Sequence, residues 1–367
     1  MREYVDGSTA IVRGALAAGC TFFAGYPITP ASGILSGMMQ HLPARGGVAI
    51  QGEDEIASIG MCIGATMTGA KAMTATSGPG MSLYSENLGL AVMGEVPLVV
   101  VDVQRMGPGT GSATTVAQGD VQFARWGTSG GYPIIALAPS TVVECFTLTI
   151  RAFALAERFR CPVFVLTDKE MAMTLATVDA DAFPEPAVTH RPTTTAVRPY
   201  EYEPAAAVAP MQHFGGTATV RFTGSTHDEQ AMITKNPRTV GALNQHLAAK
   251  IEDHLDEIEM VDADLDHGAR TLVLGYGITA GAIRTAVAQA RAAGRSVSSI
   301  VVQSLWPVPE MQIGKALVGI ERVVVPELNL GQYRREIERL AGDREVVGVN
   351  RVDGSLISPE SILEVVR

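Results

Sequence analysis

The sequence predicts an α/β protein in which a doubly wound parallel sheet comes first and a smaller α/β domain follows. Between Cys20 and Thr167, short apolar runs rich in β-branched residues alternate with longer segments of helical period. This alternation is the pattern of parallel β-α units. A similar alternation, with fewer elements, returns after about residue 238.

The strands of the first domain are expected at the short apolar runs. These runs are Thr21–Ala24, Val48–Ile50, Ala72–Thr76, Leu98–Val103, Ile134–Leu137 and Val163–Leu166. The periodicity of the intervening segments predicts helices at Ala31–Leu42, Glu55–Thr68, Met81–Met93 and Thr141–Arg158. Ser140 is a plausible N-cap for the last helix, because a serine hydroxyl accepts hydrogen bonds from the free amides of a first helical turn.

Between about Thr174 and Pro237 the periodicity fades, and the chain becomes rich in Pro, Thr and Ala, which favours extended, irregular backbone. An acidic amphipathic helix is then predicted at Thr239–Met260. The remaining elements are strands at Thr271–Leu274, Ser298–Val302 and Val323–Val325, and helices at Thr279–Ala293, Glu310–Val318 and Gly331–Ala341. We therefore expect a first domain at residues 1–175, a connection at 176–237 and a second domain at 238–367.

Composition and charge exclude several classes of protein. The chain has 367 residues, 47% hydrophobic and 18% charged, so it can bury substantial cores. Its formal net charge of −10 opposes nucleic-acid binding, which depends on clustered Lys and Arg. Its longest apolar stretch is interrupted by Glu95 and Pro97 and falls short of the roughly 18 apolar residues of a membrane span. We expect a soluble cytoplasmic protein, with no nucleic-acid or membrane partner.

The cysteines stand far apart in the sequence, at Cys20, Cys62, Cys145 and Cys161, with no C-x-x-C pair and no histidine at ligand spacing. Neither zinc nor an iron–sulfur cluster has a local ligand set in this pattern. We interpret all four as reduced core thiols and assign no metal ligand to this chain.

Ligands of open parallel sheets bind beyond the carboxyl ends of the strands, so the loops after the predicted strands are the first candidates for a site. After the first strand, Pro27 and Pro30 fix the backbone around Thr29, whose hydroxyl is free to hydrogen-bond. The alternative interpretation of this loop is a rigid strand-to-helix turn.

The second loop leads into Glu55, which begins a helix that is almost without charge. Its carboxylate is therefore expected at the edge of a buried surface, which suits an acid that relays protons. The neighbouring Glu53 and Asp54 are more simply explained by helix capping and the helix dipole.

The next two loops differ in chemistry. Ser77-Gly78-Pro79-Gly80 gives a tight turn at a helix start where backbone could approach a planar ring, and it lacks the Lys and Ser/Thr of a nucleotide-binding P-loop. Arg105 directly follows an apolar strand and precedes small and hydroxylated residues up to Thr114. An arginine there suits bidentate capture of a substrate carboxylate, with a structural ion pair as the alternative.

Together, four segments closely resemble the alpha subunits of 2-oxoacid:ferredoxin oxidoreductases. They are Tyr26–Pro30, Glu55 with its glycine-rich helix, Thr76–Gly80 and Gln104–Thr114. The resemblance implies a thiamine-diphosphate pyrimidine-binding-type domain followed by a smaller domain like the transketolase C-terminal domain. Two further segments, Glu86–Ala91 and Pro326–Gln332, resemble the 2-oxoglutarate branch of the family.

By motif position, the resemblance places Glu55 at the aminopyrimidine ring of thiamine diphosphate. Tyr26, Pro27, Ser77 and Gly78 are the other residues that it implies for cofactor binding.

The resemblance also implies that Thr29 and Arg105 contact the oxo and carboxylate groups of the substrate, with Thr114 beside them. The implied catalytic residues are therefore Glu55, Thr29 and Arg105. The implied reaction is oxidative decarboxylation of 2-oxoglutarate with coenzyme A to succinyl-CoA and CO2, with reduction of ferredoxin and with the reverse direction left open.

Partners follow from what the chain lacks. The Gly-Asp-Gly motif that holds Mg²⁺ and diphosphate in such enzymes is missing, since Gly119-Asp120-Val121 differs from it. The resemblance therefore implies a beta subunit that carries Mg²⁺ and [4Fe-4S] clusters, thiamine diphosphate at the interface, and an (alpha-beta)2 or larger assembly. Gamma and delta subunits are further candidate partners.

The alternatives stay open at this point. The substrate could be pyruvate or a branched-chain or aryl 2-oxoacid, and the chain could belong to a lipoamide-linked dehydrogenase component. A non-catalytic scaffold subunit and an independent nucleotide-binding protein are the candidates from other classes.

Overall fold

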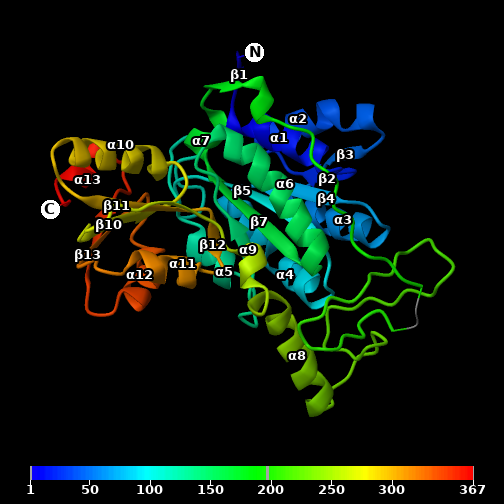
Figure 1. Cartoon of the computed structure of the whole chain (residues 1–367). Helices are drawn as coiled ribbons and strands as arrows, with labels where there is room; N and C mark the ends of the chain where they lie inside the picture. Colours follow the sequence, from blue (N-terminus) through cyan, green and yellow to red (C-terminus); the bar gives the residue numbers. More distant parts are fainter. Residues whose placement is uncertain (1, 196–197, 367) are drawn as a thin grey trace.

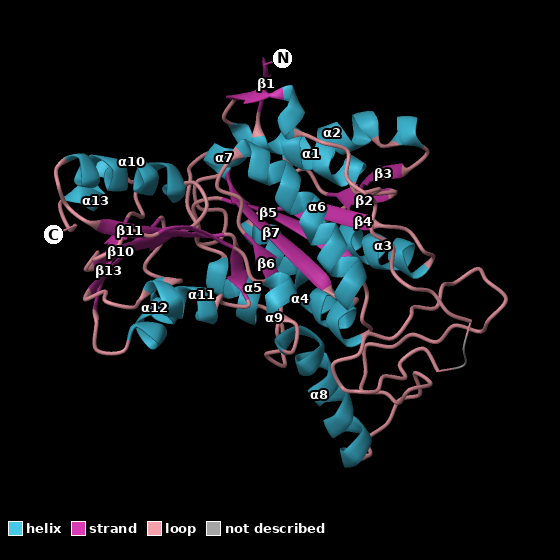
Figure 2. Cartoon of the chain, viewed as in Figure 1, coloured by secondary structure: helices cyan, strands magenta, loops and turns pink. Residues whose placement is uncertain are grey.

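The computed structural model describes residues 2–195 and 198–366, folded around two main β-sheets (Figure 1). One main sheet has seven strands and the other five, and β1 (Arg2–Val5) pairs with β8 (Ala176–Asp179) in a separate antiparallel ribbon. Helices cover both faces of each main sheet (Figure 2). The predicted α/β class, with a doubly wound sheet followed by a smaller one, is confirmed.

The strands of the first sheet lie in the order β12-β6-β7-β5-β4-β2-β3. Their bounds are β2 Phe22–Gly25, β3 Val48–Gln51, β4 Ala72–Thr76, β5 Leu98–Gln104, β6 Ile135–Leu137, β7 Pro162–Asp168 and β12 Ser304–Trp306. The pairs are parallel except β12 with β6. Because β2 and β4 are neighbours although β3 separates them in the chain, the strand order reverses there, and a ligand crevice is expected beyond their carboxyl ends.

The first sheet is buried between two layers of helices. On one face lie α1 (Gly7–Ala17), α2 (Ser32–His41) and α6 (Val142–Phe159), and on the other α3 (Glu55–Met67) and α4 (Gly78–Met93) (Figure 2). β5 and β7 are buried along their whole lengths, as expected for parallel strands covered on both faces. Shorter helices are η1 Pro43–Arg45, α5 Val121–Trp126 and α7 Lys169–Met173.

The predicted cap of α6 is wrong by one residue. Thr141 is the N-cap, because its Oγ1 accepts a hydrogen bond from the amide of Glu144 at 3.1 Å. The Glu144 carboxylate reaches back and accepts from the hydroxyl and the amide of Ser140, both at 2.7 Å. Ser140 is thus held by the first turn instead of capping it.

The second sheet has the order β14-β13-β10-β11-β9, in which β9 alone runs antiparallel to its neighbour. Its strands are β9 Val261–Asp264, β10 Thr271–Gly275, β11 Val297–Val302, β13 Arg322–Glu327 and β14 Glu345–Asn350. The helices α10 (Thr279–Ala292) and α13 (Pro359–Leu363) lie on one face, and α11 (Glu310–Ala316) and α12 (Arg334–Ala341) on the other (Figure 2).

The helix predicted at Thr239–Met260 is wrong in its extent. The structure has α8 at Pro237–Glu252 and a short α9 at Leu255–Ile258. His254 leaves the helical region with φ −127°, and Glu259 is already extended before β9 pairs with β11. The predicted helix is therefore divided at Asp253 and His254, and Glu259 and Met260 lie outside it, next to β9.

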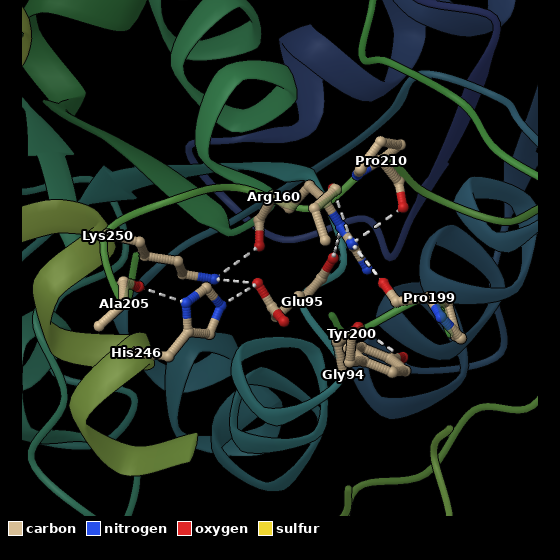
Figure 3. A network of polar contacts seen from close by, with 10 residues as sticks. Gly94, Glu95, Arg160, Pro199, Tyr200, Ala205, Pro210, His246 and Lys250 are labelled. Carbon is tan, nitrogen blue, oxygen red and sulfur yellow. Dashed lines mark hydrogen bonds and ion pairs between the residues drawn. The ribbon is translucent and has the colours of Figure 1, made fainter. Parts of the chain in front are cut away.

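Between α7 and α8, the described chain holds β8, the short turn η2 (Ala180–Ala182) and otherwise irregular backbone. The Pro and Thr content of this segment favours such irregular backbone. The connection is held down by Arg160, whose Nη1 donates to the carbonyls of Ala209 at 2.9 Å, Pro199 at 3.2 Å and Pro210 at 3.4 Å (Figure 3). An irregular segment is thereby tied to the end of α6.

A buried ionic network fixes α8 to the same place. The fully buried Glu95 carboxylate accepts hydrogen bonds from Lys250 Nζ at 2.9 Å and His246 Nε2 at 3.0 Å, both from α8 (Figure 3). His246 Nδ1 contacts the carbonyl of Ala205 at 2.7 Å, and the Tyr202 ring stacks on the imidazole at 3.7 Å. Burial opposes ionisation of Glu95, but the nearby cations of Lys250 and Arg160 hold its pKa well below the usual range.

One hydrophobic core runs from the α3–α4 face of the first sheet to the α11–α12 face of the second. β12 belongs to the first sheet although it follows β11 of the second, and the Trp306 Nε1–H donates to the carbonyl of Val121 at 3.1 Å. The two sheets are therefore packed into one body. Within the described residues, no helix is both long and apolar enough to cross a membrane.

Candidate functional site

The loops that carry the predicted site residues gather at the carboxyl ends of β2, β3, β4 and β5. Thr29 follows β2, Glu55 follows β3, Ser77 and Gly78 follow β4, and Arg105 follows β5. Since parallel strands end at the same edge, this arrangement puts these loops around the switch point between β2 and β4.

Glu55 is the first residue of α3 and is only 6% exposed. The preceding Asp54 caps the helix by accepting from the amide of Ala57 at 2.7 Å, so the helix end is satisfied without Glu55. No donor among the described residues bonds to the Glu55 carboxyl. A buried carboxyl without a partner among the described residues is available to bind a ligand.

The floor beside Glu55 is built from small and hydroxylated residues. A methyl group on Gly80 would overlap Thr76 Oγ1 and lie 2.8 Å from Glu55 Cγ, so α4 approaches the glutamate closely only because this residue is glycine. Beneath it, Thr74 Oγ1 and the Tyr84 hydroxyl form a buried hydrogen bond of 2.7 Å. The first turn of α4 therefore packs directly against the Glu55 side chain.

Ser77 is the N-cap residue of α4 but makes no capping hydrogen bond. Its Oγ is buried and has no partner in the described structure. Ser77 and Glu55 therefore provide two polar groups without hydrogen-bond partners among the described residues, at the same end of the sheet.

Arg105 lies between two loops and is 7% exposed. Its Nη1 donates to the carbonyl of Thr29 at 2.5 Å and its Nη2 to the carbonyl of Thr110 at 3.2 Å. Its Nε is buried and has no acceptor among the described residues. Arg105 is thus fixed in position by backbone groups, with no acidic residue as an ion-pair partner within 4 Å in the described chain.

The structure brings Thr29 and Arg105 together, and it places Tyr26 and Pro27, both exposed, in the same loop as Thr29. Thr114 is exposed and lies within the turn in which Ser112 Oγ and Thr115 Oγ1 are 2.5 Å apart. No hydrogen bond joins Thr114 to Arg105 in the part of the chain that the structure describes, so its role stays a prediction.

A cavity of about 580 Å³ opens next to Arg105, between the first sheet and the loop after β13. Gly78 and Arg105 line it from the first sheet, and Asn329 and Gln332 line it from the second. The Pro326–Gln332 segment, singled out in the sequence for its resemblance alone, is therefore one wall of a cavity.

Hydrogen bonds of Asn329 fix the conformation of the Pro326–Gln332 segment. Asn329 Nδ2 donates to the carbonyl of Gln118 at 2.7 Å and to the Tyr276 hydroxyl at 2.9 Å. Its Oδ1 accepts from the amides of Gly331 and Gln332, both at 2.8 Å. The loop is thus shaped by one asparagine that also reaches across to the other sheet.

Sequence reasoning missed a pair of carboxyl groups behind Arg105. Asp102 lies inside β5 and is fully buried, and Asp120 precedes α5 and lines the cavity. The signal was an aspartate in the middle of an otherwise apolar strand, which requires a partner when buried. In the sequence, Gly119-Asp120-Val121 stands out only by its difference from a diphosphate motif.

All four cysteines are buried and free. Burial raises the pKa of each thiol, in Cys20 and Cys161 to about 12. Within residues 2–195 and 198–366, no group of three or more His, Cys, Asp or Glu side chains could hold a metal ion.

Comparison with known families gives two matches. The family described as pyruvate flavodoxin/ferredoxin oxidoreductase, thiamine-diphosphate-binding, matches residues 13–245. The family described as pyruvate:ferredoxin oxidoreductase core domain II matches residues 269–362.

Curated relatives match over nearly the whole chain. The 2-oxoglutarate synthase subunit KorA of Methanothermobacter marburgensis is 41% identical, over 98% of this chain and 97% of the relative. KorA of Methanocaldococcus jannaschii is 41% identical over 98% of both chains. The ketoisovalerate oxidoreductase subunit VorB of Methanothermobacter thermautotrophicus is 35% identical over 100% of this chain and 97% of the relative.

Similar solved structures include the following two. A 2-oxoglutarate:ferredoxin oxidoreductase from Magnetococcus marinus, with 2-oxoglutarate, coenzyme A and succinyl-CoA bound, has a TM-score of 0.93 at 33% identity. The similarity covers 99% of this chain and 64% of that one, so this chain spans less than two thirds of its length. A split-gene transketolase, with a TM-score of 0.55 at 10% identity over 98% of this chain and 95% of its own, shows the shared fold alone.

Proposed function

This chain belongs to the pyruvate flavodoxin/ferredoxin oxidoreductase family, and on that premise we propose that it is the alpha-type subunit of a 2-oxoglutarate:ferredoxin oxidoreductase. The observation that carries the substrate is the full-length similarity to the 2-oxoglutarate synthase subunits, 41% against 35% for the ketoisovalerate subunit. The reaction is oxidative decarboxylation of 2-oxoglutarate with coenzyme A to succinyl-CoA and CO2, with electrons passed to ferredoxin.

Thiamine diphosphate fits the residues at the crevice. The ring end of the cofactor needs a carboxyl group at a ring nitrogen, and Glu55 is buried without a hydrogen-bond partner in the described chain. Ser77 Oγ is a second buried polar atom without a partner among the described residues, and Gly80 lets the first turn of α4 lie directly against Glu55. When bound, the cofactor supplies the electron sink for loss of carbon dioxide.

Within this proposal, Glu55 holds a proton against the ring nitrogen. Glu55 is buried at the start of α3, and exclusion of bulk water strengthens such a hydrogen bond. Ser77, Gly78, Tyr26 and Pro27 shape the surroundings of the ring.

Arg105 binds the carboxylate next to the oxo group, and Thr29 lies beside it. The guanidinium is already oriented by two backbone carbonyls, so little freedom is lost when a carboxylate binds its remaining N–H groups. This preorganisation supports a binding role for Arg105 over a structural ion pair. Thr114 remains a candidate for the same subsite.

A partner chain completes the enzyme. We assign Mg²⁺ and the [4Fe-4S] clusters to a beta subunit, with an (alpha-beta)2 or larger assembly and gamma and delta subunits as further components. The relatives are named as subunits, and the exposed Tyr26 and Pro27 at the rim of the crevice support a site shared with another chain. The cytoplasmic location expected from the sequence stays a prediction.

A branched-chain 2-oxoacid is the second candidate substrate, favoured by the 35% identity to the ketoisovalerate oxidoreductase subunit over the whole chain. Pyruvate and aryl 2-oxoacids are further members of the same reaction class. All of these substrates would use the same carboxylate and oxo contacts at Arg105 and Thr29.

The test is a viologen-reduction assay of the complex purified with its native partners, with 2-oxoglutarate, pyruvate and 2-oxoisovalerate, each with and without coenzyme A. We expect reduction that depends on coenzyme A and is fastest with 2-oxoglutarate. Glu55→Gln is expected to lower turnover by at least about 10²-fold, since it removes an acid from the proton path.

Glu53→Gln is the matched control, because Glu53 is an exposed carboxylate in the same turn and should keep full turnover. Faster reduction with another 2-oxoacid would overturn the substrate but keep the chemistry. Full activity of Glu55→Gln in the complex would favour a scaffold subunit instead.

A further inference from the structure

Two carboxyl groups, the buried Asp102 and the half-buried Asp120, lie near Arg105, and the proposed reaction uses neither. Asp102 is fully buried in β5, and neither of its oxygens accepts a hydrogen bond from a donor group of the described residues. Asp120 lies within hydrogen-bond distance of it and lines the same cavity as Arg105. Because two like charges cannot both ionise at that distance in a buried place, the pair shares a proton.

The neighbours hold Asp120 in this geometry. Its backbone amide donates to Gln104 Oε1 at 3.1 Å, and Gln104 Nε2 in turn donates to the carbonyl of Thr167 at 3.3 Å. A methyl group on Gly78 would lie 2.9 Å from both Asp120 carboxylate oxygens, so the start of α4 packs directly against the carboxyl. The side chain has little room to turn away from Arg105.

Few other charges act on the pair. Arg105 is the cation that acts on Asp120, and Asp102 is the neighbouring acid. The next carboxyls on the packed elements are Glu55 of α3 and Asp168 at the end of β7, and neither contributes to the titration of the pair.

The surroundings decide which carboxyl holds the proton. Burial raises the pKa of Asp102 well above its usual range, and the neighbouring Asp120 raises it further. Burial raises the pKa of Asp120 to about 6, although the hydrogen bond with Asp102 and the charge of Arg105 both lower it. Near neutral pH, Asp102 therefore carries the proton, and Asp120 is mostly ionised and balances the charge of Arg105.

We propose that Asp120 takes up a proton from solvent when an anionic carboxylate binds at Arg105, so that substrate binding is coupled to protonation of the Asp102–Asp120 pair. This inference rests on the proposed role of Arg105 as the carboxylate ligand. A bound carboxylate adds a negative charge and takes over the guanidinium that kept Asp120 ionised. Protonation of Asp120 restores the charge balance, and Asp120 acts as a positioning residue that never touches the reacting carbon.

Coupling to one proton sets the pH dependence. Below about pH 6, Asp120 is already protonated in the free enzyme, and affinity should not change with pH. Above it, each bound carboxylate must bring a proton with it, so the dissociation constant rises by up to about tenfold per pH unit. The KM of the 2-oxoacid should rise in the same way while kcat changes little, because the effect belongs to binding.

The experiment is calorimetric titration of the assembled holoenzyme with glutarate, a dicarboxylate that lacks the reactive oxo group. Titrations at pH 7 and pH 8, each in two buffers of different ionisation enthalpy, give the number of protons taken up. We expect uptake approaching about one proton per glutarate in the unmodified enzyme. Asp120→Asn should show almost none, with an affinity that hardly changes with pH.

Two further variants control for folding and for unrelated titration. Asp102→Asn supplies an amide that donates the hydrogen bond that the shared proton made, so it should fold and retain uptake at Asp120. Asp168→Asn is the matched control: burial also raises the pKa of Asp168 to about 6, but its carboxylate accepts from the amide of Met171 at the start of α7. It should show the uptake of the unmodified enzyme.

An Arg105→Met variant separates this inference from the proposed function. Failure of glutarate to bind the unmodified enzyme, or undiminished binding to Arg105→Met, would remove the carboxylate site and both proposals with it. Glutarate binding that requires Arg105 but is accompanied by no proton uptake would overturn the proposed proton coupling and leave the carboxylate site intact. Uptake that persists in Asp120→Asn would also overturn it.

Discussion

Gly80 illustrates how a single residue without a side chain makes room for a functional group. It lies in the first turn of α4, where Thr76 and Glu55 occupy the space that a Cβ atom would need. Thr76 belongs to a buried strand and cannot retreat, so any added carbon must push Glu55 or α4 aside.

Gly80→Ala is therefore expected to displace the Glu55 carboxyl and lower turnover of the assembled complex by about 10²-fold, since small misplacements of a catalytic group have effects of that size. Gly60→Ala is the matched control, because Gly60 is an exposed residue of α3 and an added methyl group would meet nothing within 4 Å. It should keep turnover and raise stability by about 0.5–1 kcal/mol. Equal turnover of the two variants would show that Glu55 does not depend on the close approach of α4.

At the residue scale, the sequence predicts which residues of the loops after the strands lie close together. Thr29 and Arg105 could be predicted as neighbours because parallel strands end at one edge, and the structure joins them by a hydrogen bond. The Asp102–Asp120 pair could not, because it forms only when the chain returns from the turn after β5 to pack against that strand. The spacing of residues along the chain does not predict that the segment before α5 packs against β5.

At the element scale, buried parallel strands are the easiest to predict, because apolar runs bounded by glycine, proline or polar residues mark them. β4 occupies the predicted residues Ala72–Thr76. β14, at Glu345–Asn350, was missed because its residues are only half-buried at the edge of its sheet, where periodicity is weak. The break between α8 and α9 was missed because neither glycine nor proline marks the chain at Asp253 and His254.

The network at α8 gives a prediction at this scale. Lys250→Met leaves the Glu95 carboxylate buried with one cation fewer, and breaking a buried pair costs about 3–5 kcal/mol (Figure 3). Urea unfolding measures the loss. Lys315→Met, at an exposed position of α11, is the control and should change stability by less than about 0.5 kcal/mol. Equal midpoints for the two variants would contradict a stabilising role for the network.

The contribution of the same network to folding stability should change with pH in a defined direction. The folded-state pKa of Glu95 is depressed, so its contribution is present above the unfolded-state pKa of about 4.3 and is lost as pH falls through the lower folded-state pKa. The stability difference between the parent chain and a Glu95→Gln variant should therefore shrink steadily below about pH 4. A difference that stays constant down to about pH 2 would contradict this assignment.

At the scale of the whole molecule, the alternation of apolar and helical segments predicts two α/β units but not how they join. β12 leaves the second unit to pair with β6 of the first, and the cavity beside Arg105 has walls from both. The Pro326–Gln332 segment was recognisable only by resemblance, because its hydrogen bonds to the first unit join residues far apart in the chain, as between Asn329 and Gln118 with a separation of 211.

Asn329 is the residue on which this junction depends most clearly. It is buried, its amide donates to Gln118 of the first unit and Tyr276 of the second, and its oxygen orders the loop. Asn329→Asp keeps the shape and the accepting oxygen but replaces both donated hydrogen bonds with a carboxylate facing the Gln118 carbonyl. We expect a cost of about 1–3 kcal/mol, because a buried polar group then lacks its partner.

That cost should appear locally, since each sheet also has a core cluster of its own besides the core that the two share. Hydrogen exchange should accelerate by about tenfold at residues 116–123 for each loss of about 1.4 kcal/mol in local stability. The amides of β10 and β5 should keep their protection. Asn244→Asp adds the same charge on α8, where Asn244 Oδ1 accepts from the Tyr132 hydroxyl at 3.1 Å and remains an acceptor, so exchange at the junction should not change. Uniform acceleration through both sheets would mean that the two units unfold as one, and that the junction has no stability of its own to lose.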